Sequence, residues 1–99
     1  MVEIVWEFVV AGDKQAEFER QYGTEGIWVD LFRRDTNYLG TSLLRDRETA
    51  GQYMTIDRWR DWGAYEAFRL KYADEYTRID ARMEHLTQSE KKVGVFDTV

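Results

Sequence analysis

The sequence predicts a single α+β domain, spanning 1–99, in which two helical segments cover one face of a four-stranded antiparallel sheet. Four stretches have the apolar patterns of strands, and two repeat apolar residues every three or four positions, as helices do. The strand-like stretches are 2–11, 38–47, 52–59 and 92–98, and the helical ones are 14–34 and 62–86. The order strand, helix, strand, strand, helix, strand is the ferredoxin-like βαββαβ plan.

The composition indicates an unusually aromatic interior. A chain of 99 residues buries roughly 60–65% of the surface that its unfolded form exposes, so a second core is not expected. Four Trp, six Tyr and five Phe are a heavy load for this length, and each such side chain buries about 150–250 Å². We therefore expect the rings either to form an aromatic core or to line a cavity or a subunit interface.

Charge, cysteine content and hydropathy exclude several classes of protein. The net charge is −5 and acids are interleaved with the arginines, which argues against a nucleic-acid surface because phosphate binding needs clustered Lys and Arg. The lack of cysteine excludes disulfides and thiolate metal sites. No apolar run approaches the roughly 18 residues of a membrane span, and the N-terminus lacks a signal pattern. We expect a cytoplasmic protein that binds neither nucleic acid nor membrane.

The first strand is expected at the centre of the sheet, because both of its faces carry apolar side chains. One face holds Val2, Ile4, Trp6, Phe8 and Val10, and the other includes Val5 and Val9.

The stretch 14–34 is expected to form one helical layer that glycines break into two pieces. Asp13 is placed to cap a helix from Lys14 to Tyr22. Thr24 is placed to cap a second piece from Glu25 to Arg34.

The stretches 38–47 and 52–59 predict a hairpin around a polar turn. If the turn centres near Thr49, one face of the hairpin carries Leu39, Thr41, Leu43 and Arg45 beside Trp59, Asp57, Thr55 and Tyr53.

The stretch 62–86 predicts a long amphipathic helix. Its apolar stripe consists of Trp62, Tyr65, Phe68, Tyr72, Tyr76, Ile79, Met83 and Leu86. A helix of this length exceeds a ten-residue strand, so we expect it to overhang the sheet or to bend near Ala73–Asp74. The opposite sheet face is too apolar to sit in water, and a homodimer that packs sheet against sheet is expected to cover it.

Three short motifs carry a resemblance to a known family. They are the tryptophan that ends TIDRW, the tyrosine six residues later in GAY, and the phrase YLGTSLLRD before the hairpin turn. With the order of elements, they resemble the antibiotic biosynthesis monooxygenase-like family of dimeric α/β barrels. The resemblance implies a pocket between sheet and helices in each subunit. It also implies oxidation of anthrone-type phenols to quinones by O₂ with no metal or organic cofactor.

The resemblance also implies roles for individual residues. Trp59 and Tyr65 stand where the family's enzymes have a Trp and a Tyr in the pocket. Thr55 stands where those enzymes carry an Asn that bonds the substrate, and a hydroxyl cannot present the two-sided pattern of an amide. An arginine of the second helix is implied as well, either Arg78 or Arg82.

The haem-degrading branch of the same superfamily uses a histidine on the second helix to bind iron. The only histidine here is His85, near the end of that helix and off its apolar stripe. We interpret His85 as a capping or surface residue, because metal sites show clustered ligands, and we expect no metal site.

The chemistry expected of the pocket depends on one acid and several rings. Asp57 alternates with Thr55 and Trp59 on an interior strand, so burial would raise its pKa and make it a general base. An ion pair with Arg45 or another arginine would instead lower that pKa and serve structure. Pocket walls are expected from Trp6, Phe8, Trp28, Phe32, Trp59, Tyr65, Phe68 and Tyr72, although core packing alone would also explain these rings.

Two functions are predicted. The first is a cofactor-independent monooxygenase of a small aromatic or polyketide-type phenol. In it Asp57 is the base, Trp59, Tyr65 and Phe68 bound the cavity, and Thr55 and Tyr72 bind substrate oxygens. The second is a non-catalytic dimeric domain that binds a small apolar ligand.

Overall fold

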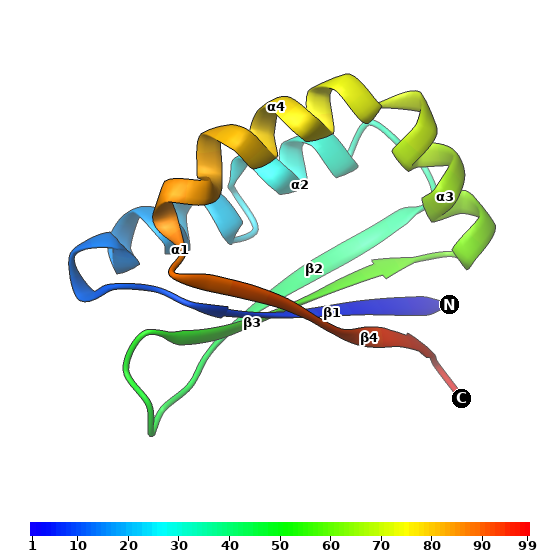
Figure 1. Ribbon diagram of the computed structural model, residues 1–99. Helices are drawn as coiled ribbons and strands as arrows, with labels where there is room; N and C mark the ends of the chain where they lie inside the picture. The colour runs from blue at the N-terminus through cyan, green and yellow to red at the C-terminus, as the bar shows by residue number, and fades with distance from the viewer.

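A computed structural model describes residues 1–99 and has the predicted α+β, ferredoxin-like architecture, with all helices on one face of a single four-stranded sheet (Figure 1). The strands are β1 (Val2–Val9), β2 (Tyr38–Arg45), β3 (Gln52–Trp59) and β4 (Ser89–Asp97). The helices are α1 (Gln15–Tyr22), α2 (Ile27–Phe32), α3 (Trp62–Lys71) and α4 (Ala73–Met83), with short 3-10 turns at Gly12–Lys14 and Glu84–Leu86.

Strand β1 lies inside the sheet, as its two apolar faces predict. The order is β2-β3-β1-β4, and every neighbouring pair is antiparallel. Val2, Ile4 and Phe8 of β1 are buried beneath the helices. Strand β1 pairs with both β3 and β4. Its register with them therefore determines which residues of all three strands face the helical layer.

The first helical layer is broken as predicted, but its predicted caps are wrong. Neither Asp13 nor Thr24 caps a helix through its side chain, and α1 begins only at Gln15, after a 3-10 turn. Glycine is needed at position 26, just before α2, because a Cβ atom there would collide with the carbonyl oxygen of Gln21. Close packing of backbone on backbone, rather than a polar cap, therefore sets the start of α2.

The hairpin register is as predicted except at its open end. Thr41, Leu43 and Arg45 face Asp57, Thr55 and Tyr53, but Tyr38, not Leu39, lies opposite Trp59. A bulge between Tyr38 and Gly40 accounts for this shift, and it leaves Leu39 53% exposed. Gly40 has a φ of 136°, which only glycine adopts readily.

The second helical segment is interrupted one residue before the predicted bend. Helix α3 begins after Asp61, whose carboxylate accepts a hydrogen bond from the Ala64 amide at 2.8 Å. Tyr72, with φ −110° and ψ 27°, ends α3 and precedes α4. Figure 1 shows the two helices running in different directions, so α4 crosses back over the sheet beside α2.

Aromatic rings form much of the core. The Trp59 ring is fully buried against Phe68 at 4.8 Å between centroids, and also packs on Tyr38 at 5.4 Å and Tyr65 at 5.5 Å. Phe68 is fully buried as well. Core packing alone therefore explains why Trp59 and Phe68 are aromatic.

The sheet face away from the helices is uncovered and mixed in character. At its centre Arg58 donates to Glu3 at 3.0 Å and to Ser42 at 3.0 Å. Leu44 and Phe96, on the same face, are 47% and 50% exposed.

Every helix of the chain is too short or too polar to cross a bilayer.

Candidate active site

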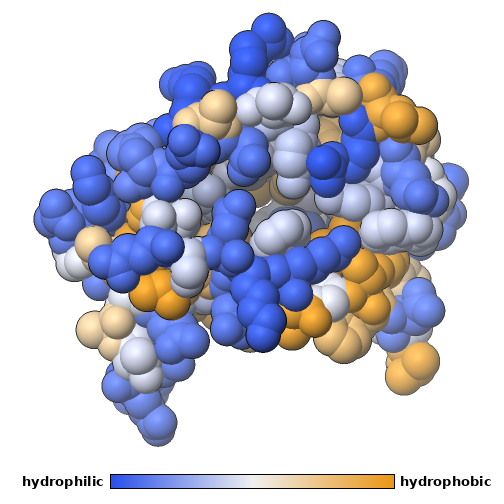
Figure 2. Space-filling model, viewed as in Figure 1, coloured by the Kyte–Doolittle hydropathy of each residue, from blue (hydrophilic) through white to orange (hydrophobic).

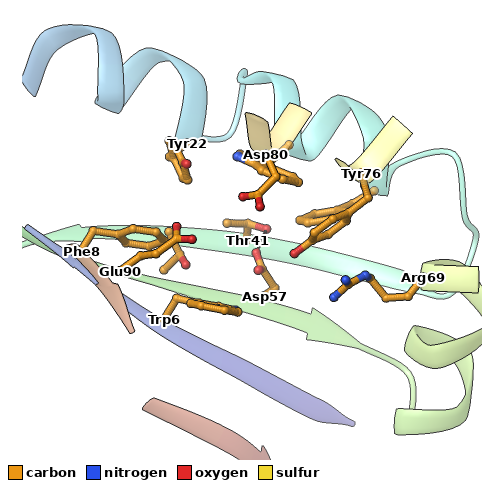
Figure 3. A pocket seen from close by; sticks show the side chains of 12 residues that line it. Trp6, Phe8, Tyr22, Thr41, Asp57, Arg69, Tyr76, Asp80 and Glu90 are labelled. Carbon is orange, nitrogen blue, oxygen red and sulfur yellow. Dashed lines mark hydrogen bonds between the residues drawn. The ribbon is translucent and has the colours of Figure 1, made fainter. Parts of the chain in front are cut away.

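A cavity of about 210 Å³ lies between the sheet and the helical layer. Figure 2 shows the molecular face hollowed there, and Figure 3 shows side chains entering the hollow from both layers. The sheet contributes Trp6, Phe8, Thr41, Thr55, Asp57 and Glu90, and the helices contribute Tyr22, Trp28, Phe32, Arg69, Tyr76 and Asp80. Aromatic walls with a few converging polar groups are typical of small-molecule sites.

The cavity brings together about half of the residues predicted for the site. Asp57, Thr55, Trp6, Trp28 and Phe32 line it, together with Phe8.

Four other predicted residues do not line the cavity: Trp59, Tyr65, Phe68 and Tyr72. Trp59 and Phe68 have no exposed surface and so support the walls from behind. Tyr65 is linked to the site by Arg69, whose Nη1 donates to its hydroxyl at 3.1 Å.

Asp57 is the acid at the sheet side of the cavity. Its Oδ1 accepts a hydrogen bond from Thr41 Oγ1 at 2.7 Å. Burial raises the pKa of Asp57 to about 6, and the Thr41 hydrogen bond and the charge of Arg58 offset only part of that effect. A carboxylate with this pKa can take a proton from a substrate near neutral pH.

The alternative ion pair between Asp57 and Arg45 is wrong. Arg45 Nη1 instead lies 3.0 Å from Glu19. Arg58, on the other face of β3, donates to Glu3 and Ser42. No arginine therefore neutralises Asp57 by direct contact.

Arg69 of α3 is the cation of the cavity, and it was not among the residues predicted from the sequence. Its guanidinium carbon lies 3.7 Å from the centre of the Tyr76 ring, an arrangement that fixes the charge over an aromatic face. The predicted Arg78 and Arg82 border a separate hollow between α2 and α4. A signal was present, because Arg69 follows Tyr65 by four residues and such residues are neighbours on a helix.

Asp57, Tyr76 and Arg69 point toward the same part of the cavity (Figure 3). Burial raises the pKa of Tyr76 well above its ordinary value, so its hydroxyl stays protonated and can donate.

Two further acids, Asp80 of α4 and Glu90 of β4, enter the cavity from opposite layers (Figure 3). Neither forms an ion pair. Burial raises the pKa of Glu90, and the negative charges of Asp80 and Glu84 raise it further. Neither residue was predicted from the sequence, since a polar residue on a helix or at a strand end normally faces solvent.

Metal-binding residues are not clustered. No group of three or more His, Asp or Glu side chains is arranged to hold a metal ion. His85 is exposed, lies in the turn Glu84–Leu86 and does not line the cavity, in line with its interpretation as a surface residue.

Comparison with protein-family models finds one match, the antibiotic biosynthesis monooxygenase model, over residues 1–71. The chain belongs to the antibiotic biosynthesis monooxygenase family.

Solved structures with the same fold include members of this family. SnoaB from Streptomyces nogalater, a cofactor-independent oxygenase solved as a variant, is 21% identical with a TM-score of 0.73, over 98% of this chain and 91% of SnoaB. A structure described as an antibiotic biosynthesis monooxygenase is 16% identical with a TM-score of 0.69, over 100% and 99% of the two chains. PA3566 from Pseudomonas aeruginosa is 20% identical with a TM-score of 0.70, over 99% and 93%. No curated protein matches the chain significantly.

The family match covers only part of the cavity lining. The matched residues include three of the four strands and α3. They therefore include Asp57, Thr55 and Arg69, whereas Tyr76, Asp80 and Glu90 come from the part beyond the match.

Proposed function

We propose that the protein is a monooxygenase that oxidises an aromatic, polyketide-type phenol with O₂ in the cavity beneath α4. The observation that supports this proposal best is Asp57, a carboxyl group with a pKa raised to about 6 in an aromatic-walled cavity that also contains Arg69. A weak base and a cation in one cavity are what removal of a proton from a phenolic substrate requires.

The walls bind and orient the substrate. A flat ring system packs between the aromatic side chains of the sheet and those of α2, chiefly Trp6, Trp28 and Phe32.

Asp57 then removes a proton, and Arg69 stabilises the resulting anion. The anion carries its charge on oxygen, where the guanidinium and the Tyr76 hydroxyl can donate to it. Oxidation of a methylene carbon by O₂ leaves one oxygen atom as the new carbonyl and releases the other as water, so the electrons balance without a further reductant.

The experiment is oxygen uptake by the purified protein with a hydroxyanthrone and no added cofactor. We expect turnover that rises between pH 5 and 7 as Asp57 ionises. Asp57→Asn should abolish turnover while ligand binding, followed by tryptophan fluorescence, persists. Uptake equal to that of buffer across several such phenols would contradict the enzyme, and full activity of Asp57→Asn would contradict the base.

A second function is favoured by one departure from the family, the Thr55 hydroxyl in place of an amide. In that case the protein is a dimeric domain that binds a small apolar ligand without reacting with it. Saturable fluorescence quenching by the hydroxyanthrone, with uptake equal to that of buffer, would support this function.

We also propose that the protein is a homodimer joined through the uncovered sheet face. The support is the exposed apolar surface of Leu44 and Phe96 on that face, with the Glu3 and Arg58 pair between them. A second copy presents the same apolar and charged groups, which a two-fold axis can bring together.

A further inference from the structure

A chain of hydroxyl groups leads away from Asp57 along the sheet. Thr41 Oγ1 lies 2.7 Å from Asp57 Oδ1, and the Tyr38 hydroxyl lies 2.6 Å from Thr41 Oγ1. An ionised carboxylate only accepts hydrogen bonds, so the single proton of Thr41 points at Asp57. Tyr38 must then donate to Thr41, and both hydroxyl protons point toward Asp57.

A backbone irregularity makes this chain possible. Residues three apart in a regular strand face opposite sides of the sheet, so Tyr38 and Thr41 would not meet. The bulge at Leu39 adds one residue and returns Tyr38 to the face of Thr41. Gly40, with its φ of 136°, provides the conformation that the bulge needs. Bulges are over-represented beside active sites, where they redirect a side chain.

The chain runs toward the edge of the fold. Tyr38 lies on β2, which is an edge strand, and its side chain is only partly buried. Burial raises the pKa of Tyr38, and the positive charges of Arg33 and Arg58 offset only part of that effect. The path from Asp57 through Thr41 to Tyr38 thus leaves the cavity through its wall rather than through its mouth, which a bound ligand would fill.

We propose that Thr41 and Tyr38 are positioning residues that hold the Asp57 carboxyl group toward the cavity and carry its proton to solvent after each turnover. This role rests on the proposed function of Asp57 as base. Once Asp57 is protonated, both hydroxyl groups rotate so that Thr41 donates to Tyr38 and Tyr38 donates to water. Asp57 then passes its proton to Thr41 Oγ1, Thr41 passes its own proton to the Tyr38 oxygen, and Tyr38 passes its own to water. Each O–H bond that breaks is replaced by another, and no electrons are transferred.

The first test does not depend on turnover. Carboxyl-carbon NMR titration should show that Thr41→Val raises the pKa of Asp57 by about one unit, because it removes a hydrogen bond to the charged form. Thr41→Ser keeps the hydroxyl and should keep the wild-type pKa. A Thr41→Val protein in which Asp57 titrates as in the wild type would overturn the proposal.

The second test measures proton release during turnover. Tyr38→Phe should lower kcat about tenfold in dilute buffer with KM unchanged, and should make kcat rise with buffer concentration as buffer replaces the lost hydroxyl. Tyr53→Phe is the matched control, since it removes a hydrogen-bonded hydroxyl from the same face of the sheet, at Glu19, outside the cavity. A Tyr38→Phe kcat equal to that of the wild type, or one lowered without buffer dependence, would overturn the relay.

The two tests separate this proposal from the proposed function. Wild-type protein without turnover on any phenol contradicts the oxygenase and with it the relay, whereas turnover with a normal Tyr38→Phe contradicts the relay alone.

Discussion

Arg69 lies over the ring of Tyr76, with 3.7 Å between its guanidinium carbon and the ring centroid. This contact joins α3 to α4 across the break at Tyr72 and holds the one cation of the cavity wall in place. Stacking already restricts the guanidinium, so binding an anion costs it little further conformational freedom.

Arg69→Gln should therefore weaken binding of a hydroxyanthrone. The loss of a charge-assisted hydrogen bond corresponds to about 1.5–3 kcal/mol, or a roughly 10- to 100-fold rise in Kd, measured by tryptophan quenching at pH 8. Arg78→Gln is the control, because Arg78 is exposed outside the cavity and pairs with Glu75 at 3.7 Å. Equal Kd values for wild type and Arg69→Gln would remove Arg69 from the site.

Asp57 should make the protein less stable as the pH rises through 6. Its folded-state pKa is raised from 3.8 to about 6, so the folded protein binds the proton more tightly than the unfolded chain does. The resulting stability is present below pH 3.8 and is lost as the pH rises through 6. At pH 7.5 the free energy of unfolding of Asp57→Asn, measured with urea, should exceed that of the wild type by about 1–3 kcal/mol. This difference should shrink at pH 4. A pH-independent difference would contradict the raised pKa.

The acids Asp80 and Glu90 should select against anionic ligands. A carboxylated hydroxyanthrone should bind the wild type more weakly than the neutral compound does. Asp80→Asn should strengthen binding of the carboxylated ligand by roughly 1 kcal/mol, or about fivefold in Kd, and leave binding of the neutral ligand unchanged. The same substitution should lower the pKa of Glu90, since the charge of Asp80 contributes to raising it. Equal improvement for both ligands would show that Asp80 acts by shape instead.

The sheet face should be the dimer interface. Light scattering of the wild type at micromolar concentration should give twice the chain mass of 11.8 kDa. Phe96→Asp should give the monomer, because the two-fold axis would bury the new charge twice. Leu70→Glu is the control, since Leu70 of α3 is 83% exposed and lies away from the sheet face. A monomeric wild type would contradict the interface.

The fold could be predicted from the sequence because each element has an alternation or a stripe that matches the face it buries. The bulge at Leu39 could not, since Tyr38 and Leu39 are both apolar enough to face the helices and only Gly40 hinted at an irregular strand.

The site was harder to predict for a physical reason. Asp57 and Thr55 lie on an interior strand and could be recognised from its alternation. Arg69 and Asp80 are polar residues on helices, and only the tertiary meeting of α3, α4 and the sheet turns them toward a cavity. Trp59 was expected there from its likeness to the family, but Phe68 and Tyr38 enclose it in the core.

Gly40 connects the bulge to both stability and function. An alanine at Gly40 would have free space for its Cβ, since no atom lies within 4 Å, but it would be held at a φ of 136° that L-residues rarely adopt. Gly40→Ala should therefore destabilise the fold by about 1–3 kcal/mol in urea unfolding. Gly12→Ala is the control, because Gly12 also has free space and no positive φ, and its effect should stay within about 0.5 kcal/mol. If the strand relieves the strain by losing the bulge, Tyr38 turns away from Thr41, and Gly40→Ala should then show the buffer-dependent kcat of Tyr38→Phe. A Gly40→Ala protein as stable as the Gly12→Ala control would contradict the strained turn.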